Sequence, residues 1–159
     1  MRNHRLILAF LVQLLVCFNV LGQSEKRFNI IIQINDEIAV GGVARIHIEA
    51  DSDNEAKKWD AGYIPGELTL PLEVIQLLET DSTKSVNLKF VHYSYKGQRQ
   101  FTQQYSIELN STVLNQDYVI INAYDLTQRK YKKQFEHLTQ DDTIYEFIFP
   151  GSGRWIRKK

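Results

Sequence analysis

The chain has 159 residues, of which 19 are lysine or arginine and 19 are aspartate or glutamate, so its formal net charge at pH 7 is zero. Bulk electrostatic binding of nucleic acid needs a basic surface that neutralises phosphates, so we expect no nucleic-acid partner. The single cysteine, Cys17, excludes a disulfide within the chain.

Residues 1–22 have the composition of a secretory signal peptide. Arg2 and Arg5 precede an apolar run of 16 residues, and the small Gly22 follows that run. Because a helix that spans a bilayer needs about 20 apolar residues, the run favours cleavage over retention as a membrane anchor. We therefore expect an exported protein, secreted or periplasmic, in which residues 23–159 form a single domain.

The predicted cleavage also changes the charge and the cysteine content. Loss of Arg2 and Arg5 from the 19 basic residues leaves 17 against 19 acidic residues, a net charge of −2, and Cys17 is lost as well. Disulfides, thiolate metal sites and cysteine nucleophiles are then excluded. Lipidation of Cys17 is the alternative, but the preceding Val16 is larger than the residue a lipobox usually carries. No later run of 18 or more apolar residues occurs, so we expect no transmembrane helix in the mature chain.

Two segments near the start of the domain alternate between apolar and polar residues, which predicts half-buried strands. Residues 28–34 place on one face Phe28, Ile30, Ile32 and Ile34. Residues 43–50 place on one face Ala44, Ile46, Ile48 and Ala50, and on the other Arg45, His47 and Glu49. The residues that suit turns between them are Asn35-Asp36 and Gly41-Gly42.

A loop, a turn and a helix are predicted next. Residues 51–58 are polar and predict a loop, and Pro65-Gly66 predicts a turn. Residues 71–80 are the best helix candidate, because Pro71 suits a first turn and apolar side chains recur at helical spacing. The side chains expected on the buried face of this helix are Leu72, Ile75 and Leu78.

The clearest local structure is a hairpin with a two-residue turn at Gly97-Gln98. If Lys96 faces Arg99, the apolar pairs across the hairpin are Phe90 with Tyr105, Leu88 with Ile107 and Val86 with Leu109. Glycine at the first turn position is typical of a type II′ turn. The side chains expected on the outer face are Lys89, Tyr93 and Tyr95 against Gln100, Thr102, Gln104 and Glu108.

Three further segments complete the predicted strands. Residues 118–124 are apolar on both faces apart from Asn122, which is typical of a central strand, and residues 131–135 and 143–149 predict two shorter strands. Residues 152–159 form a short basic tail. About seven strands with short turns and one inserted helix predict an all-β protein, an antiparallel β-sandwich of the immunoglobulin-like or transthyretin-like kind.

The histidines and acids form no local pattern of a catalytic or metal site. His47, His92 and His137 are far apart in the sequence, so no zinc spacing is present. Acids alternate in residues 51–55, but Ala56 stands where an EF-hand needs glycine. No nucleophile elbow, Walker loop or Rossmann glycine motif occurs. We therefore expect no catalytic residue, no metal and no cofactor.

Four aromatic residues are the candidate binding residues: Tyr93, Tyr95, Trp59 and Trp155. Periodicity does not place them, or Tyr63, in a core. Exposed aromatic rings on a flat sheet anchor protein partners or stack on sugar rings. For the two tryptophans we favour the alternative that they cover the ends of the sandwich, where large rings are often partly buried.

Three hypotheses for the function follow. The first is a non-catalytic module that binds another protein, as an accessory component of a bacterial envelope assembly. The end of the signal, Leu21-Gly22-Gln23, resembles that of many bacterial envelope proteins. The second is a carbohydrate-binding module, in which Trp59 or Trp155 would contact a glycan. The third is a hydrolase whose carboxylates come from separate strands, because sequence proximity does not exclude such a pair.

Overall fold

The computed structural model describes residues 25–50, 57–80, 85–151 and 153–156, the last four as backbone only. The predicted signal peptide, residues 1–22, and the acidic segment 51–55 lie outside the described residues. The elements in chain order are β1 (Glu25–Phe28), β2 (Ile30–Ile34), β3 (Glu37–Ile38), β4 (Val43–Ala50), β5 (Lys57–Asp60), β6 (Gly62–Ile64), β7 (Glu67–Pro71), α2 (Leu72–Thr80), β8 (Ser85–Lys96), β9 (Arg99–Asn110), α3 (Ser111–Leu114), β10 (Val119–Asp125), α4 (Arg129–Phe135), β11 (Thr143–Phe149) and β12 (Gly153–Ile156).

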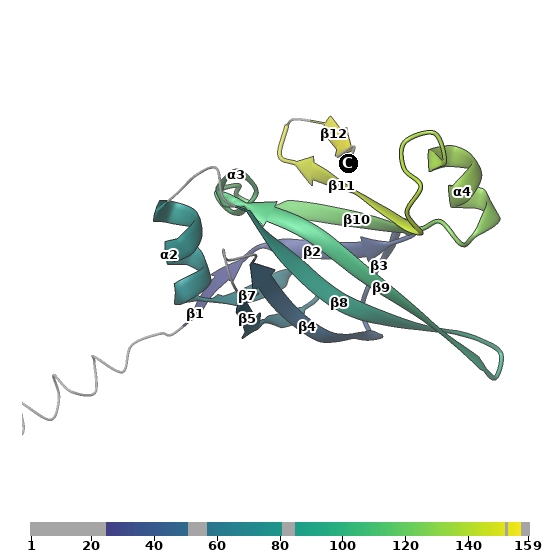
Figure 1. The fold of residues 1–159 in the computed structure, drawn as a ribbon, viewed down its shortest axis with the longest axis horizontal. Helices are drawn as coiled ribbons and strands as arrows, with labels where there is room; N and C mark the ends of the chain where they lie inside the picture. The colour runs from purple at the N-terminus through teal and green to yellow at the C-terminus, as the bar shows by residue number, and fades with distance from the viewer. Residues whose placement is uncertain (1–24, 51–56, 81–84, 152, 157–159) are drawn as a thin grey trace, which may run out of the picture.

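The strands form three sheets, shown in Figure 1. We name them the small sheet (order β1-β7-β6), the central sheet (β12-β11-β10-β2-β3) and the hairpin sheet (β5-β4-β8-β9). The all-β class is confirmed, since strands predominate and the helices are few and short. The described residues contain more strands than the seven expected, and β10 pairs with β2 in parallel, whereas the prediction was purely antiparallel.

The first predicted strand divides into two strands in different sheets. β1 pairs with β7 of the small sheet, whereas β2 pairs with β10 of the central sheet. Asn29 lies at the crossing, where its carbonyl accepts the Val119 N–H at 2.9 Å and its side-chain amide donates to the Asp117 carbonyl at 3.0 Å. The predicted burial of Ile30, Ile32 and Ile34 is confirmed.

A β-bulge corrects one prediction for β4. Ala44 pairs with Val91 and His47 pairs with Lys89, so two residues of β4 lie opposite the single Phe90 of β8. The extra residue moves the alternation by one position, and Val43, not Ala44, packs against the core beside Ile46. Arg45 adopts the left-handed conformation that one family of bulges requires, with φ 53°.

The predicted hairpin is confirmed in its register. β8 pairs with β9 along all twelve residues of each strand, with Lys96 opposite Arg99 and Phe90 opposite Tyr105. Their rings stack with centroids 5.1 Å apart. Gly97 has φ 63°, while Gln98 is not among the residues with positive φ, which agrees with a type II′ turn.

Residues 131–135 are helical, so the strand predicted there is wrong. Tyr131 and Phe135 are four residues apart, and a helix brings such side chains to the same face. Both pack against Tyr124, with ring centroids 5.2 Å and 4.6 Å away. Over five residues, an alternating apolar pattern does not distinguish a strand from one turn of helix.

Three smaller differences concern the boundaries of predicted elements. Lys57 and Lys58, predicted to lie in a loop, begin β5. Pro71 ends β7 instead of entering the helix, and Leu72 is exposed while Val74 shares the buried face of α2. The short helix α3 was not predicted.

The buried residues form two cores. The main core lies among the sheets and α2, and a second, smaller core lies beneath α4 around Tyr124. Beside the second core is a buried polar network, in which Tyr124 donates to Glu146 Oε1 at 2.7 Å and Asn122 Nδ2 donates to Tyr124 at 2.8 Å. Burial, and next the hydrogen bond to Glu146, raise the pKa of the Tyr124 phenol. In the described part of the chain, no helix has the length and apolar character to cross a membrane.

Candidate interaction site

The distal half of the β8–β9 hairpin extends beyond the rest of the described chain (Figure 1). Residues 94–102 are all exposed, and two large apolar side chains lie among them, Tyr95 at 69% exposure and Phe101 at 51%. Successive residues of a strand point to opposite faces. Tyr95 therefore lies on the outer face of the hairpin sheet, and Phe101 lies on the face that continues from the core.

The outer face carries Tyr93 and Tyr95, the two tyrosines that the alternation of the sequence predicts there. The register places Tyr93 opposite Thr102 and Tyr95 opposite Gln100, as predicted. Tyr93 is half-buried and Tyr95 is exposed. This pair forms an aromatic strip on a mostly polar sheet face, next to the half-buried Val91, and we call it the tyrosine strip.

The loop between β3 and β4 holds the base of the tyrosine strip. The Tyr93 N–H donates to the Gly42 carbonyl at 2.8 Å. Gly42 has φ 77°, and a Cβ atom built there would lie 2.4 Å from the Tyr93 carbonyl oxygen. Only glycine fits this close approach. The loop backbone at Gly42 can therefore contact the backbone of Tyr93 directly and hold it in place.

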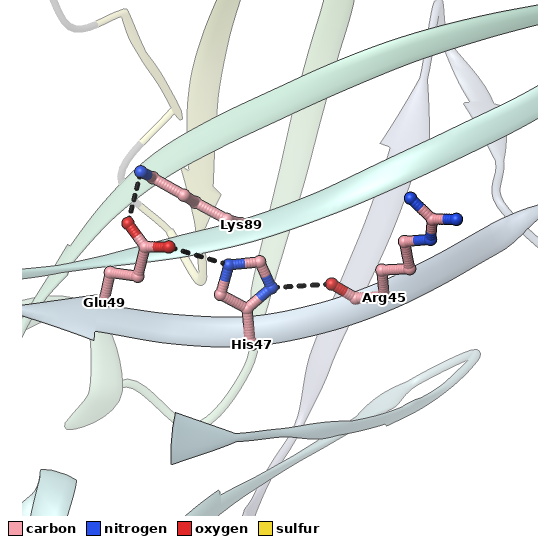
Figure 2. A network of polar contacts seen from close by, with 4 residues as sticks. All are labelled: Arg45, His47, Glu49 and Lys89. Carbon is pink, nitrogen blue, oxygen red and sulfur yellow. Dashed lines mark hydrogen bonds and ion pairs between the residues drawn. The ribbon is translucent and has the colours of Figure 1, made fainter. Parts of the chain in front are cut away.

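A charged cluster occupies the same outer face nearer the body of the protein (Figure 2). Glu49 forms an ion pair with Lys89, and its other oxygen lies 3.0 Å from His47 Nε2. His47 Nδ1 lies 2.7 Å from the Arg45 carbonyl, so both ring nitrogens face acceptors. The hydrogen bonds from Lys89 and His47 lower the pKa of the Glu49 carboxyl. These contacts join Lys89, Glu49, His47 and the Arg45 carbonyl in a chain, and they form a polar surface.

A cleft of about 460 Å³ lies between the inner face of the hairpin and the central sheet. The hairpin contributes aromatic and polar side chains to it, and the β2–β3 turn, the end of β10 and α4 contribute the rest. Its lining consists of Ile34, Asn35, Glu37, His92, Ser94, Phe101, Thr102, Gln103, Tyr105, Asp125, Thr127, Gln128 and Tyr131. A volume in this range is typical of ligand sites in proteins.

Two groups in the cleft have a perturbed pKa. Burial lowers the pKa of His92, and the nearby Asp125 opposes that shift. Burial, and next the charge of Asp125, raise the pKa of Tyr105. The Tyr105 hydroxyl is buried without a hydrogen-bond partner in the described structure, which is uncommon for a polar atom.

The two carboxylates of the cleft, Asp125 and Glu37, have different surroundings. Asp125 accepts hydrogen bonds from the Thr127 N–H at 2.9 Å, from its hydroxyl at 2.6 Å and from Gln128 Nε2 at 3.3 Å. These bonds fix the turn before α4, and they give Asp125 a structural role. Glu37, the other acid of the cleft, is exposed.

The two predicted tryptophans lie on strands other than the one that carries Tyr93 and Tyr95. Trp59 lies on β5, half-buried against the core, and its indole N–H donates to Glu73 at 2.8 Å. Trp155 lies on β12, and its side chain is outside the described residues. The Tyr63 hydroxyl accepts the Ile32 N–H at 2.9 Å, which ties two sheets together. Among the named aromatics whose side chains the structure describes, Tyr93 and Tyr95 are the pair that shares a surface.

Sequence reasoning missed the cleft. Alternation placed Phe101 and Tyr105 correctly on the inner face of the hairpin, but it gave no sign that the core ends before Phe101. The described residues contain no group of three or more histidine, cysteine, aspartate or glutamate side chains suited to hold a metal ion. Comparison with known proteins finds no matching family model, no matching curated protein and no matching solved structure.

Proposed function

We propose that this chain is an exported, non-catalytic β-sandwich module that binds another protein, as an accessory component of a cell-envelope assembly. The observation that carries the proposal is the tyrosine strip, Tyr93 and Tyr95, on a hairpin that extends away from the body of the protein. The signal-like residues 1–22 support export, and the predominance of strands supports the sandwich architecture.

An exposed tyrosine gains stabilisation when a binding partner covers its ring. Tyr95 keeps 69% of its surface in water, although burial of a large aromatic side chain stabilises a contact by roughly 1.5–3 kcal/mol. Tyrosine is enriched among the residues that dominate binding energy in protein interfaces. The neighbours of the strip across the hairpin are neutral and polar, Gln100 and Thr102, which suits the rim of an interface.

The two alternatives have less support from the same surfaces. The carbohydrate-binding hypothesis relies on Trp59 or Trp155, and Trp59 is packed against the core with its N–H already bonded to Glu73. The hydrolase hypothesis requires a pair of free acids across a cleft, and Asp125 is held by Thr127 and Gln128. Protein binding is therefore the function that the described geometry supports best.

The test replaces both tyrosines of the strip by serine. The double variant Tyr93→Ser/Tyr95→Ser and the wild type are each used to capture partners from the envelope fraction of the source cell. The matched control is Tyr118→Ser, which removes an exposed tyrosine that precedes β10 and lies outside the hairpin. We expect at least a tenfold loss of the captured partner with the double variant, no loss with the control and little change in melting temperature.

Two results would contradict the proposal. Capture that is equal for the wild type, the double variant and the control would show that the strip is not an interface. A large fall in melting temperature for the double variant would make the tyrosines part of the core, and a Tyr95→Ser single variant would then separate binding from folding.

A further inference from the structure

β9 is an edge strand of the hairpin sheet, and half of its backbone groups point away from β8. In an antiparallel pair, hydrogen-bonded and non-hydrogen-bonded positions alternate, and the residues that flank a two-residue turn are hydrogen-bonded. Lys96 and Arg99 are therefore bonded, and so are the pairs at every second position. The residues of β9 whose N–H and C=O groups point outward are Gln100, Thr102, Gln104, Ser106, Glu108 and Asn110.

The outward groups near the base of the hairpin are already satisfied. The Glu108 N–H donates to the Tyr145 hydroxyl at 3.1 Å, and the Asn110 side chain caps α3 by accepting the Val113 N–H at 3.0 Å. Toward the tip, the only described bond is a long one, 3.5 Å, from the Gln103 side chain to the Gln104 carbonyl. Residues 100–106 therefore form an open edge in the described part of the chain.

This open edge lacks the features by which proteins protect an edge strand. Native edges are usually blunted by charged side chains, proline or bulges. Residues 100–106 contain no charged residue, no proline and no glycine, and β9 runs without a bulge along its whole length. An open, neutral and regular edge is a template for another strand.

We infer that this edge pairs with the same edge of a second copy, antiparallel and centred on Gln103. Gln100 then lies opposite Ser106, and Thr102 opposite Gln104, so that each of the four outward positions gains a partner. The ladder is bounded on one side by the turn and on the other by the Glu108–Tyr145 bond. The result is a continuous sheet of order β5-β4-β8-β9-β9-β8-β4-β5.

The side chains favour a second copy as the occupant. In this register Phe101 of each copy lies opposite Tyr105 of the other, a ring that is already buried in its own chain, so the added aromatic contact falls mainly to Phe101. The pairing would cover Phe101, which is 51% exposed in the single chain. No like charges meet, since Arg99 lies opposite Ile107 and Gln98 opposite Glu108. The tyrosine strip stays free on the outer face, so the pairing is independent of the proposed function.

The first test measures mass in solution for proline and alanine variants of one residue. Because the Gln104 N–H points outward, Gln104→Pro removes a bond of the proposed ladder but none of the β8–β9 bonds. Sedimentation equilibrium of the full chain with a Cys17→Ser substitution should give a dimer. Gln104→Pro should dissociate at least tenfold more readily, and the matched control Gln104→Ala should remain dimeric.

The second test fixes the register. At the centre of the ladder, Gln103 faces Gln103 at a non-hydrogen-bonded position, where Cα atoms are about 4.5 Å apart, close enough for a disulfide. In the Cys17→Ser background, Gln103→Cys should form a covalent dimer on mild oxidation, and Gln100→Cys should not. A chain that is monomeric at all concentrations, or Gln104→Pro that dimerises as well as Gln104→Ala, would overturn the inference. Equal cross-linking of the two cysteine variants would do the same.

Discussion

The backbone N–H of Glu108 donates to the hydroxyl of Tyr145 at 3.1 Å, and this bond joins the hairpin sheet to β11 of the central sheet. Glu108 lies on the edge strand β9, and its N–H points away from β8. Without the Tyr145 hydroxyl, this N–H would need another acceptor. The bond therefore serves both the packing of two sheets and the protection of the edge near the base of the hairpin.

Tyr145→Phe should lower the free energy of unfolding by about 0.5–1.5 kcal/mol, the usual net value of one hydrogen bond. The ring itself remains and keeps its edge contact with Phe147, whose centroid is 5.5 Å away. Urea denaturation measures the loss, and Tyr118→Phe, on an exposed tyrosine, is the control. Amide exchange at Glu108 should become faster, and an unchanged exchange rate there would contradict the role given to this bond.

Gly42→Ala should destabilise the protein, whereas Gly41→Ala should not. A Cβ atom at Gly42 would lie 2.4 Å from the Tyr93 carbonyl, and φ at this position is 77°. A Cβ atom at Gly41 would meet no atom within 4 Å. Strain of this kind costs roughly 1–3 kcal/mol. The two melting temperatures provide the measurement, and equal values for the neighbouring variants would show that the loop yields without cost.

The strands, the turn and the register of the β8–β9 hairpin were all predictable from the sequence. The alternation along both strands and the glycine of the turn each specify the same register. A slip of one residue would bring polar side chains into the core, so burial alone selects the pairing of Phe90 with Tyr105. The tyrosine strip followed from the same alternation. Long segments with consistent local signals are the ones from which a sequence specifies structure most strongly.

Other features depended on contacts that no local pattern reveals. The helix over Tyr131 and Phe135 is chosen because Tyr124, at the end of the preceding strand β10, offers an aromatic surface to one helical face. The bulge at Arg45 and the change of sheet at Asn29 are single-residue events within segments that alternate well. The cleft arises from side chains of five separate segments, and periodicity within one segment does not report on such an assembly.

Tyr105→Phe should leave the free energy of unfolding equal or raise it. The Tyr105 hydroxyl is buried without a partner in the described structure, and a buried unsatisfied polar group costs about 1–3 kcal/mol. Phenylalanine removes that cost and keeps the stack on Phe90. Chemical denaturation of the variant measures the change. A clear loss of stability would mean that the hydroxyl has a partner in solution, such as a bound water or a ligand in the cleft.

His92 couples the stability of the fold to pH. Burial lowers the pKa of His92 in the folded chain below its ordinary value of 6.5, although Asp125 opposes the shift. Between the folded pKa and about 6.5 the unfolded chain binds more protons at this residue than the folded chain does. The contribution of His92 to stability is therefore complete above pH 6.5 and is lost as the pH falls through this window.

His92→Gln should make the free energy of unfolding depend less on pH between 7.5 and 5.5, because glutamine binds no proton in either state. Urea denaturation at several pH values compares the slopes of the wild type and the variant. The control His137→Gln makes the same substitution at an exposed histidine in the turn after α4, outside the cleft, and shows what the exchange itself does to the slope. If the slope of His92→Gln equals that of the wild type, the lowered pKa of His92 does not contribute to stability.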